Sequence, residues 1–274
     1  MIINMLKAHN LINEAQAIII TAGAGMGVDS GLPDFRGNEG FWKEYPPIAT
    51  LGYDFEQMAN PSLFDTNPKL AWGFYGHRLK LYRDTIPHEG FKLLLELVKN
   101  KDNNYFVFTS NVDGQFQKAG FDKDKIYEVH GSIHHLQCTE ACIQSVWENN
   151  VEDIEIDMDK LEAKTLPQCG NCKELSRPNI LMFGDWSFIG KRTDNQAREF
   201  HNWTMKNKGK KIVIIEIGAG SAVPTIRSFG DRFSRMEEGA TLIRINPREY
   251  DVTGEKNISI EAGGLEGIKQ VYDG

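Results

Sequence analysis

The sequence contains no apolar run as long as a membrane-spanning helix, and its first twenty residues lack the pattern of a secretory signal peptide. We therefore expect a cytoplasmic protein. Basic residues are not in excess either, because 31 Lys and Arg stand against 38 Asp and Glu, for a net charge of −7. This balance argues against binding through bulk charge, so we expect neither nucleic acid nor a membrane as a direct partner.

Cysteine is scarce: the chain has four, all between residues 138 and 172. They form two close pairs, Cys138 with Cys142 and Cys169 with Cys172. Short spacings let two thiolates of one turn reach a single ion, and four thiolates complete the tetrahedral shell of Zn²⁺. We predict a structural zinc site with no position left for catalytic water, so that the nearby His134 and His135 are not needed as ligands. A disulfide pair and buried free thiols are the alternatives.

The usual dinucleotide fingerprint is also missing. Residues 21–27, TAGAGMG, follow an apolar run, but their glycines are spaced G-x-G-x-G instead of G-x-G-x-x-G. A clear acidic residue at the end of a second strand, about 20 residues further on, is lacking. A dehydrogenase and a turn without a ligand therefore remain alternatives to a loop that approaches a pyrophosphate.

Several apolar stretches predict buried strands of a parallel sheet. Runs that are rich in β-branched residues and do not alternate suit strands covered on both faces, and helical patterns such as residues 88–100 separate them. The runs are Ala15 to Thr21, Tyr105 to Thr109, Ile212 to Ile217 and 241–246, with a further strand in IYEVHG before His130. Strand–helix alternation predicts an α/β fold. Two segments interrupt it, and we expect a smaller inserted domain made of a helical insertion, 38–85, and a zinc-binding module, 133–178.

Polar or glycine-rich segments follow four of these runs. They are Gly23 to Gly27, Ser110 to Asp113, Gly218 to Ser221, and Asn246. Ligands of open α/β sheets bind outside the carboxyl ends of the strands. The sequence therefore predicts one site at this edge of the sheet.

Several motifs resemble those of the sirtuin (Sir2) family. TAGAGMGVDSGLPDFRG at 21–37 resembles its GAG loop and (D/T)FRG segment, TSNVDG at 109–114 is similar to its T-Q-N-I-D segment, and VHG at 129–131 resembles its catalytic-histidine motif. The cysteine pairs, RPNILMFGD at 177–185, GAGSAVP at 218–224 and IN at 245–246 follow in family order. The resemblance implies an NAD-dependent protein lysine deacylase that releases nicotinamide, O-acyl-ADP-ribose and free lysine, with NAD as co-substrate and a bound zinc.

The resemblance also implies an organisation of the chain. A Rossmann-like NAD-binding domain would comprise residues 1–37, 86–132 and 179–274, with the two inserted segments as the small domain. The partners would be acylated lysine side chains of proteins. The acidic run at 148–162 is either a solvated loop or a surface that favours basic peptides.

Individual roles follow from the same resemblance. His130 and Asn111 would be catalytic, with His130 as the base that acts on the ribose hydroxyls. Asn111 and Asp113 would bind the nicotinamide ribose and carboxamide, and Phe35 would shield the anomeric carbon. The implied cofactor-binding residues are Gly23, Ala24, Gly25, Asp34, Phe35, Arg36, Ser110, Asn111, Asp113, Gly218, Ala219, Gly220, Ser221 and Asn246. Taken alone, His130 fits a core histidine equally well, and Asn111 to Asp113 a polar turn.

The substrate side rests on three segments. RPNILMFGD would pair with the substrate backbone as an added strand and bring Phe183 and Gly184 to the substrate. Tyr75 and Arg78 are spaced i, i+3 on a predicted helix, so they share a face on which a carboxylate can bind. They resemble the Tyr-x-x-Arg motif of sirtuins that prefer succinyl- or malonyl-lysine, and Ala59 matches the small residue that widens their pocket. A helix with a core tyrosine and a surface arginine is the alternative.

Some positions depart from the family pattern. Ser110 stands where glutamine is usual, Ala219 replaces a hydroxyl residue, and Asp185 replaces a glutamate. An ADP-ribosyltransferase or NAD hydrolase on the same scaffold is the first alternative function. A catalytically silent nucleotide-binding or zinc-interaction module is the second.

Overall fold

A six-stranded sheet forms the centre of the computed structural model, which describes residues 2–34, 37–151 and 154–273. The strand order is β11-β10-β9-β1-β2-β3, and every neighbouring pair is parallel. The bounds are β1 Ala17–Ala22, β2 Tyr105–Thr109, β3 Ile126–Glu128, β9 Ile212–Ile217, β10 Ala240–Ile245 and β11 Ile258–Ile260. Each predicted run coincides with a strand to within two residues, and the predicted α/β fold class is confirmed.

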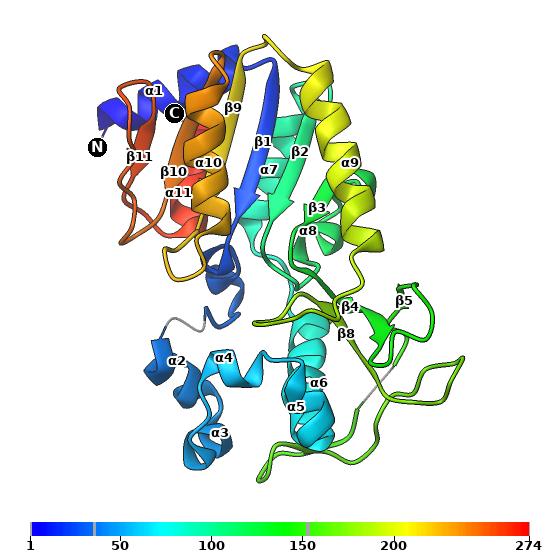
Figure 1. Cartoon of the computed structure of the whole chain (residues 1–274). Coiled ribbons are helices and arrows are strands. Elements are labelled where there is room, and N and C mark those ends of the chain that lie inside the picture. The colour runs from blue at the N-terminus through cyan, green and yellow to red at the C-terminus, as the bar shows by residue number, and fades with distance from the viewer. Residues whose placement is uncertain (1, 35–36, 152–153, 274) are drawn as a thin grey trace.

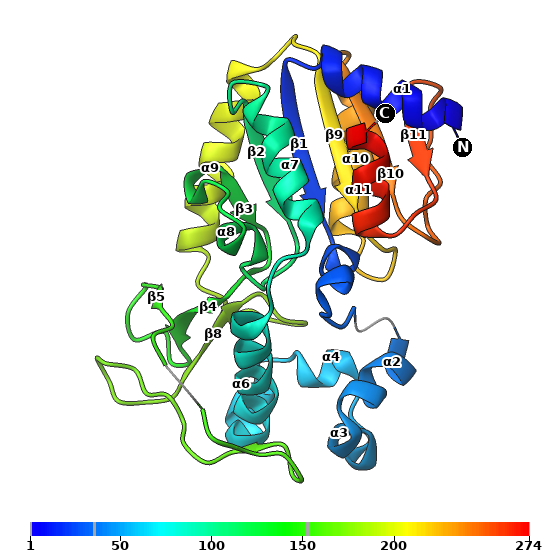
Figure 2. The same cartoon turned by 180° about the vertical axis from the view of Figure 1, so that it is seen from behind.

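Helices cover both faces of this sheet. Helices α1 (Ile2–Glu14), α7 (Glu89–Lys99) and α11 (Gly264–Asp273) lie on the face nearer the viewer in Figure 2. Helices α9 (Lys191–Lys206) and α10 (Thr225–Met236) lie on the opposite face, in front in Figure 1. Alternate residues of β1 enter different cores, Ile18 and Ile20 on the first face and Ile19 on the second. This two-sided burial explains why the strand sequence is apolar without alternation.

The helices of the smaller part are α2 (Gly37–Glu44), α3 (Pro46–Leu51), α4 (Phe55–Met58), α5 (Ser62–Thr66) and α6 (Pro68–Asp84). Helix α6 packs against a two-stranded ribbon β6-β7 and a small antiparallel sheet of order β5-β4-β8, and α2, α3 and α4 lie on its other side in Figure 1. The strand bounds are β4 Gly131–Cys138, β5 Trp147–Glu148, β6 Ile156–Asp157, β7 Glu162–Ala163 and β8 Ser176–Ile180. The remaining elements are α8 (Gln115–Lys118) and the 3₁₀ helices η1 (Ala24–Ser30) and η2 (Lys123–Lys125).

Helix α6 belongs to the first inserted segment and packs against the second. It begins at Pro68, where the side chain of Asn67 accepts a hydrogen bond from the N–H of Leu70 at 3.2 Å. Trp72 donates to the carbonyl of Ser176 on β8 at 2.8 Å. A Cβ on Gly73 would lie 1.8 Å from the carbonyl oxygen of Leu161, so only glycine permits this contact of helix and ribbon. Residues of both inserted segments therefore share one apolar core.

No helix within the described ranges combines the length and apolarity needed to cross a membrane.

Candidate active site

A cavity of about 690 Å³ lies at the carboxyl ends of β1, β2, β3 and β9, facing the smaller part of the molecule. It brings most of the predicted site residues together. Those that line it are Gly23, Ala24, Asp34, Ala59, Tyr75, Arg78, Ser110, Asn111, Asp113, His130, Phe183, Gly218, Ala219 and Gly220. Gly25, Gly184, Ser221 and Asn246 are described but do not line it. Phe35 and Arg36 lie outside the described residues.

The two glycine loops touch each other through their backbones. The N–H of Gly25 donates to the carbonyl of Gly218 at 3.0 Å. A Cβ on Gly23 would lie 2.8 Å from Cα of Ala219. Gly218 has φ of +62°, and a Cβ there would lie 2.4 Å from the carbonyl carbon of Gly25. Gly25 therefore supports the neighbouring loop, and the glycines are required by this close approach as well as by any ligand.

We expect Gly218→Ala to lower the unfolding free energy of the unliganded protein by about 2 kcal/mol or more. The left-handed backbone alone costs a residue with a Cβ roughly 1–2 kcal/mol, and the methyl group must also displace backbone. Gly220→Ala is the matched control, because the nearest atom to its added Cβ is a carboxylate oxygen of Glu249 at 3.6 Å. Urea unfolding measures both. Equal stability of the two variants would contradict the packing described above.

Asn246 and Ser221 hold the β9 loop from outside the cavity. The amide of Asn246 donates to the carbonyl of Ala219 at 2.9 Å, and its Oδ1 accepts from the N–H of Arg248 at 3.0 Å and of Glu249 at 2.9 Å. The carboxylate of Glu249 accepts from the N–H of Ser221 at 2.7 Å and from its hydroxyl at 3.0 Å. Glu249 was missed in the sequence. The available signal was an acidic residue three positions after the end-of-strand Asn246.

His130 sits between the sheet and the small domain. Its Nε2 lies 3.3 Å from Oγ1 of Thr225, and its ring also forms a hydrogen bond with the backbone of Ser110. Burial lowers the pKa of His130 below its usual value, and the hydrogen bond to Ser110 opposes the shift only in part. The imidazole is therefore neutral at neutral pH, as a proton acceptor must be.

Asn111 and Asp113 follow β2 and are fixed by the backbone. The side-chain amide of Asn111 donates to the carbonyl of Gly23 at 3.0 Å, which ties the β2 loop to the first glycine loop. Asp113 is buried, and its Oδ1 accepts from the N–H of Gln115 at 2.9 Å. Burial raises the pKa of Asp113 to about 6, and Glu128 adds to the effect while Arg78 opposes it.

The far end of the cavity is an aromatic box around Arg78. Its Nε and Nη2 donate to the hydroxyl of Tyr82 at 3.0 and 2.6 Å, and its guanidinium carbon lies 5.7 Å from the ring centre of Tyr75. Arg78 is only 7% exposed, so the alternative of a surface arginine is wrong. Tyr75 is fully buried, and among the described residues its hydroxyl has no hydrogen-bond partner. Burial also raises the pKa of Tyr75 to about 12, so the hydroxyl remains a donor.

Residues 181–183 continue beyond β8 along the cavity. The N–H of Leu181 donates to the carbonyl of His130 at 2.9 Å, and the N–H of Phe183 donates to the carbonyl of Ala59 at 2.9 Å. Leu181 and Phe183 are partly exposed, whereas Met182 is buried in the core of the small domain. The turn that follows is fixed by a buried ion pair, Arg177 Nη2 to Asp185 Oδ2, at 2.8 Å.

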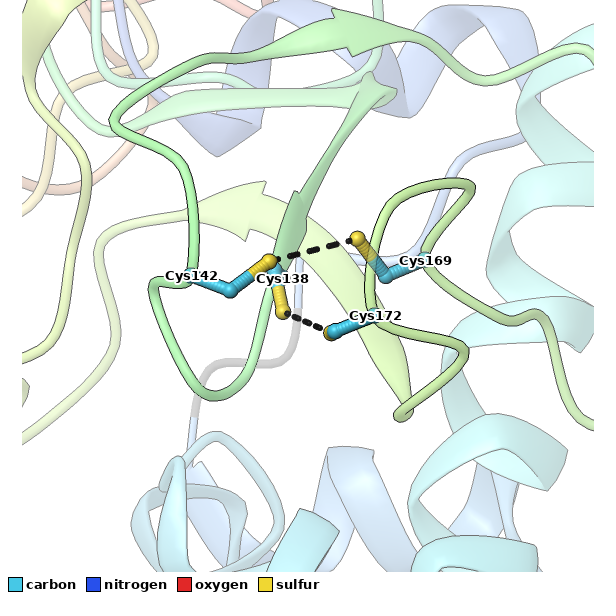
Figure 3. Close-up of side chains that lie close together, drawn as sticks. All are labelled: Cys138, Cys142, Cys169 and Cys172. Carbon is cyan, nitrogen blue, oxygen red and sulfur yellow. Dashed lines mark hydrogen bonds between the residues drawn. The ribbon is translucent and has the colours of Figure 1, made fainter.

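The four cysteines meet at one point, as Figure 3 shows. All four sulfurs lie within 4.8 Å of one another, with 3.5 Å between Cys138 and Cys172 and 3.7 Å between Cys142 and Cys169. A disulfide needs about 2.05 Å, so none is formed. Four thiolates around one Zn²⁺ at about 2.3 Å would be about 3.8 Å apart, which the observed separations approach. The donor set therefore fits zinc, while His134 instead forms a hydrogen bond with the carbonyl of Asp113 at 2.8 Å.

Known proteins share this architecture. The family model described as the Sir2 family matches residues 23–224. An NAD-dependent protein deacylase of Aquifex aeolicus is 31% identical over 258 residues, covering 93% of this chain and 94% of that protein. The chain belongs to the Sir2 family, as its motifs predicted.

Solved structures agree with this assignment. A Sir2 homologue in complex with NAD superimposes with a TM-score of 0.73 at 25% identity, over 98% of this chain and 92% of that one. A Sir2 homologue mutant in complex with ADP-ribose also gives a TM-score of 0.73 at 25% identity, over 97% and 94%. The likeness therefore covers nearly the whole of both chains.

Proposed function

We propose that this chain is an NAD⁺-dependent protein lysine deacylase that forms free lysine, nicotinamide and O-acyl-ADP-ribose. One observation carries the proposal: a single cavity is lined by two glycine loops, by His130 and Asn111, and by the buried pair Tyr75 and Arg78. A dinucleotide and an acyl-lysine can thus reach the same histidine. The A. aeolicus relative is named an NAD-dependent protein deacylase, and solved Sir2 homologues are complexes with NAD or ADP-ribose.

The loops at the ends of β1, β2 and β9 would hold NAD⁺. Backbone N–H groups of the glycine loops suit its pyrophosphate, and Asn111 and Asp113 suit the nicotinamide half. Bound NAD⁺ supplies a ribose carbon from which nicotinamide can leave. Gly25, Ser221 and Asn246 would contribute at least by fixing the loops, and their direct contact with the cofactor stays a prediction.

His130 would act as the general base toward a ribose hydroxyl. Its ring is neutral near pH 7 because burial lowers its pKa, and the hydrogen bond to the backbone of Ser110 orients it. Its Nε2 points toward Thr225, whose hydroxyl at 3.3 Å holds the ring until substrate arrives.

The four-cysteine cluster would hold a structural zinc ion. Thiolates fill all four positions, which leaves no place for a reactive water. The ion would cross-link the end of β4 to the turn at 169–172, and no chemical step passes through it.

We also propose the division of the chain given by the sequence: residues 1–37, 86–132 and 179–274 as the NAD-binding domain, and 38–85 with 133–178 as the small domain. The apolar clusters support it, because two flank the large sheet and the third lies mainly among the inserted segments. That third cluster also takes in Leu32, Val112, Ile180 and Met182 of the proposed NAD-binding domain. Strand β8 ends at Ile180, two residues beyond the proposed boundary.

The preferred acyl group would carry a carboxylate, as succinyl and malonyl groups do. The end of the cavity is lined by a guanidinium and by a tyrosine hydroxyl that is buried without a partner within the described residues. An unpaired buried hydroxyl costs free energy unless a ligand completes its hydrogen bond. A carboxylate accepts from both groups, whereas an acetyl methyl group cannot.

Tyr75→Phe should therefore lower kcat/KM for succinyl-lysine peptide about tenfold and leave the value for acetyl-lysine peptide within about twofold, since one hydrogen bond to a charged group is worth roughly 1.5–3 kcal/mol. Folding should not suffer, because the hydroxyl removed has no described protein partner. Tyr45→Phe is the control, because it removes another buried tyrosine hydroxyl, which is already hydrogen-bonded to His77 at 3.1 Å and belongs to a residue that does not line the cavity. Parallel loss of both activities in Tyr75→Phe would count against carboxylate recognition.

Mass spectrometry of the products tests the proposed function. Acetyl-, succinyl- and unmodified-lysine peptides are incubated with the protein, with and without NAD⁺. Deacylated peptide together with O-acyl-ADP-ribose supports the proposal. Addition of ADP-ribose to peptide, or nicotinamide release without deacylation, would replace it with a transferase or a hydrolase.

A further inference from the structure

A second, larger cavity of about 1260 Å³ lies on the other side of the Asp113 loop, and we call it the rear groove. Its lining residues come from the first turns of α9, from the segment around α8 and from strands β4 and β5. These elements lie at the centre right of Figure 1. Tyr82 and Asp113 line both this groove and the cofactor cavity. One wall therefore separates the two.

The rear groove has the opposite charge balance to the whole chain. Lysines and arginines outnumber acidic residues six to four in its lining, although acidic residues outnumber basic ones 38 to 31 overall. The basic residues come from four separate elements and their ends: Arg83, Lys118, Lys123, Lys191, Arg192 and Arg198. Cations that converge from several elements on one hollow concentrate a positive field there.

Hydrogen bonds to the protein hold at least four of these cations, Arg83, Lys118, Arg192 and Arg198. The ammonium of Lys118 donates to the carbonyls of Arg83 and Thr85 at 2.5 and 2.6 Å. These two contacts fix the position of the ammonium group, and because carbonyls are uncharged they do not neutralise its charge. Arg192 pairs with the buried Glu128 through Nη2. These contacts place the charges before any ligand arrives, which reduces the entropy lost on binding.

Unused hydrogen-bond donors accompany the charge. In the described part of the chain, neither Nη1 of Arg192 nor Nδ1 of His135 has a hydrogen-bond partner; both residues line the groove, and the two nitrogen atoms themselves are buried beneath its surface. Burial lowers the pKa of His135 to about 4, and Arg192 and His134 add to the effect. The His135 ring is therefore neutral and can donate one N–H.

Hydroxyl groups and an indole ring lie among these cations in the lining of the groove. The cations surround one hollow that is also lined by Ser132, Ser145 and the half-buried Trp147. Phosphate groups carry several acceptor oxygens on one centre and bind such converging donors well. We propose that the rear groove binds a small phosphate-bearing anion, at a site separate from that of the co-substrate.

Isothermal titration with inorganic pyrophosphate tests this proposal. The full-length protein is first saturated with ADP-ribose, so that pyrophosphate does not enter the glycine loops. We expect one salt-sensitive site, and the double variant Lys191→Ala/Arg198→Ala should weaken its affinity about tenfold or more. Lys206→Ala is the matched control, since Lys206 is exposed on the same helix α9 but does not line the groove, and its affinity should stay unchanged.

Equal pyrophosphate affinity in the double variant and the wild type would overturn the proposal. So would tighter binding of an acidic peptide than of pyrophosphate at the same ionic strength, which would make the groove a protein-docking surface. The comparison between variants holds whether or not ADP-ribose binds. Failure of ADP-ribose to bind would count against the proposed enzymatic function alone.

Discussion

The variant His130→Ala should lose deacylation, with kcat/KM lowered about 10²–10⁴-fold, the usual contribution of a positioned general base. Its NAD⁺ affinity should change little, because the glycine loops and Asn111 are held by contacts that do not involve the histidine ring. O-acyl-ADP-ribose formation, followed by mass spectrometry, measures the first effect, and titration with NAD⁺ measures the second. Equal loss of binding and turnover would show that the side chain is structural.

The pH dependence of the wild type provides an independent check. Burial lowers the pKa of His130, so the neutral base persists below pH 6.5 and is lost only as the pH falls through that lowered value. The acid limb of the kcat/KM profile should therefore lie below pH 6.5. His201→Ala, an exposed histidine of helix α9, should leave both the rate and the profile unchanged. An acid limb above 6.5 would argue against His130 as the titrating group.

Removal of zinc should have the largest effect on stability. Structural zinc ions bind zinc-finger peptides with apparent free energies of about 10–16 kcal/mol, and that energy is available only in the folded state. Here the ion would close the sheet made by β4 and β8 at the end distant from His130. We expect one zinc per chain by elemental analysis. Chelation, or the variant Cys169→Ser, should lower Tm by more than about 10 °C.

Deacylation should fall with the metal, because β4 begins at Gly131, directly after His130, and Leu181 after β8 donates to the carbonyl of His130. Gln144→Ser changes an exposed residue of the same turn region and is the control. Added Zn²⁺ should restore the chelated protein. Full activity and an unchanged Tm in a protein shown to be free of zinc would refute the structural role.

The central strands could be predicted because both of their faces are buried, which makes their sequences continuously apolar. Strand β1 has Ile18 and Ile20 on one face and Ile19 on the other, so apolar and polar residues do not alternate along the run. The short length of the run then favours a strand over a helix. Strand β11, Ile258–Ile260, was missed because it is short and no recognised motif follows it, whereas the equally short β3 leads directly into VHG. The cysteine cluster could be predicted for a different reason. The two cysteines of each pair are close in sequence, and the preference of zinc for four tetrahedral ligands implies that the two pairs meet.

The site could be predicted for those residues whose position at the cavity follows from a nearby sequence motif. His130, Asn111 and Asp113 line the cavity. Asn246 and Ser221 do not, because Ala219 and Glu249 use their hydrogen-bonding groups, and side-chain contacts between loops far apart in sequence leave no local pattern. The aromatic box around Arg78 was equally hidden, since the sequence alone did not distinguish a surface arginine from one that is 7% exposed.

The segment 181–183 has a consequence for the whole site because its pairing is periodic. Alternate N–H groups bind the carbonyls of His130 and Ala59, and the side chain between them, Met182, points into the small-domain core. A slip of one residue in this register would take the Met182 side chain out of the small-domain core and turn its neighbours into that core. The backbones of His130 and Ala59 are thus held two residues apart along one segment, and neither can shift along that segment without the other.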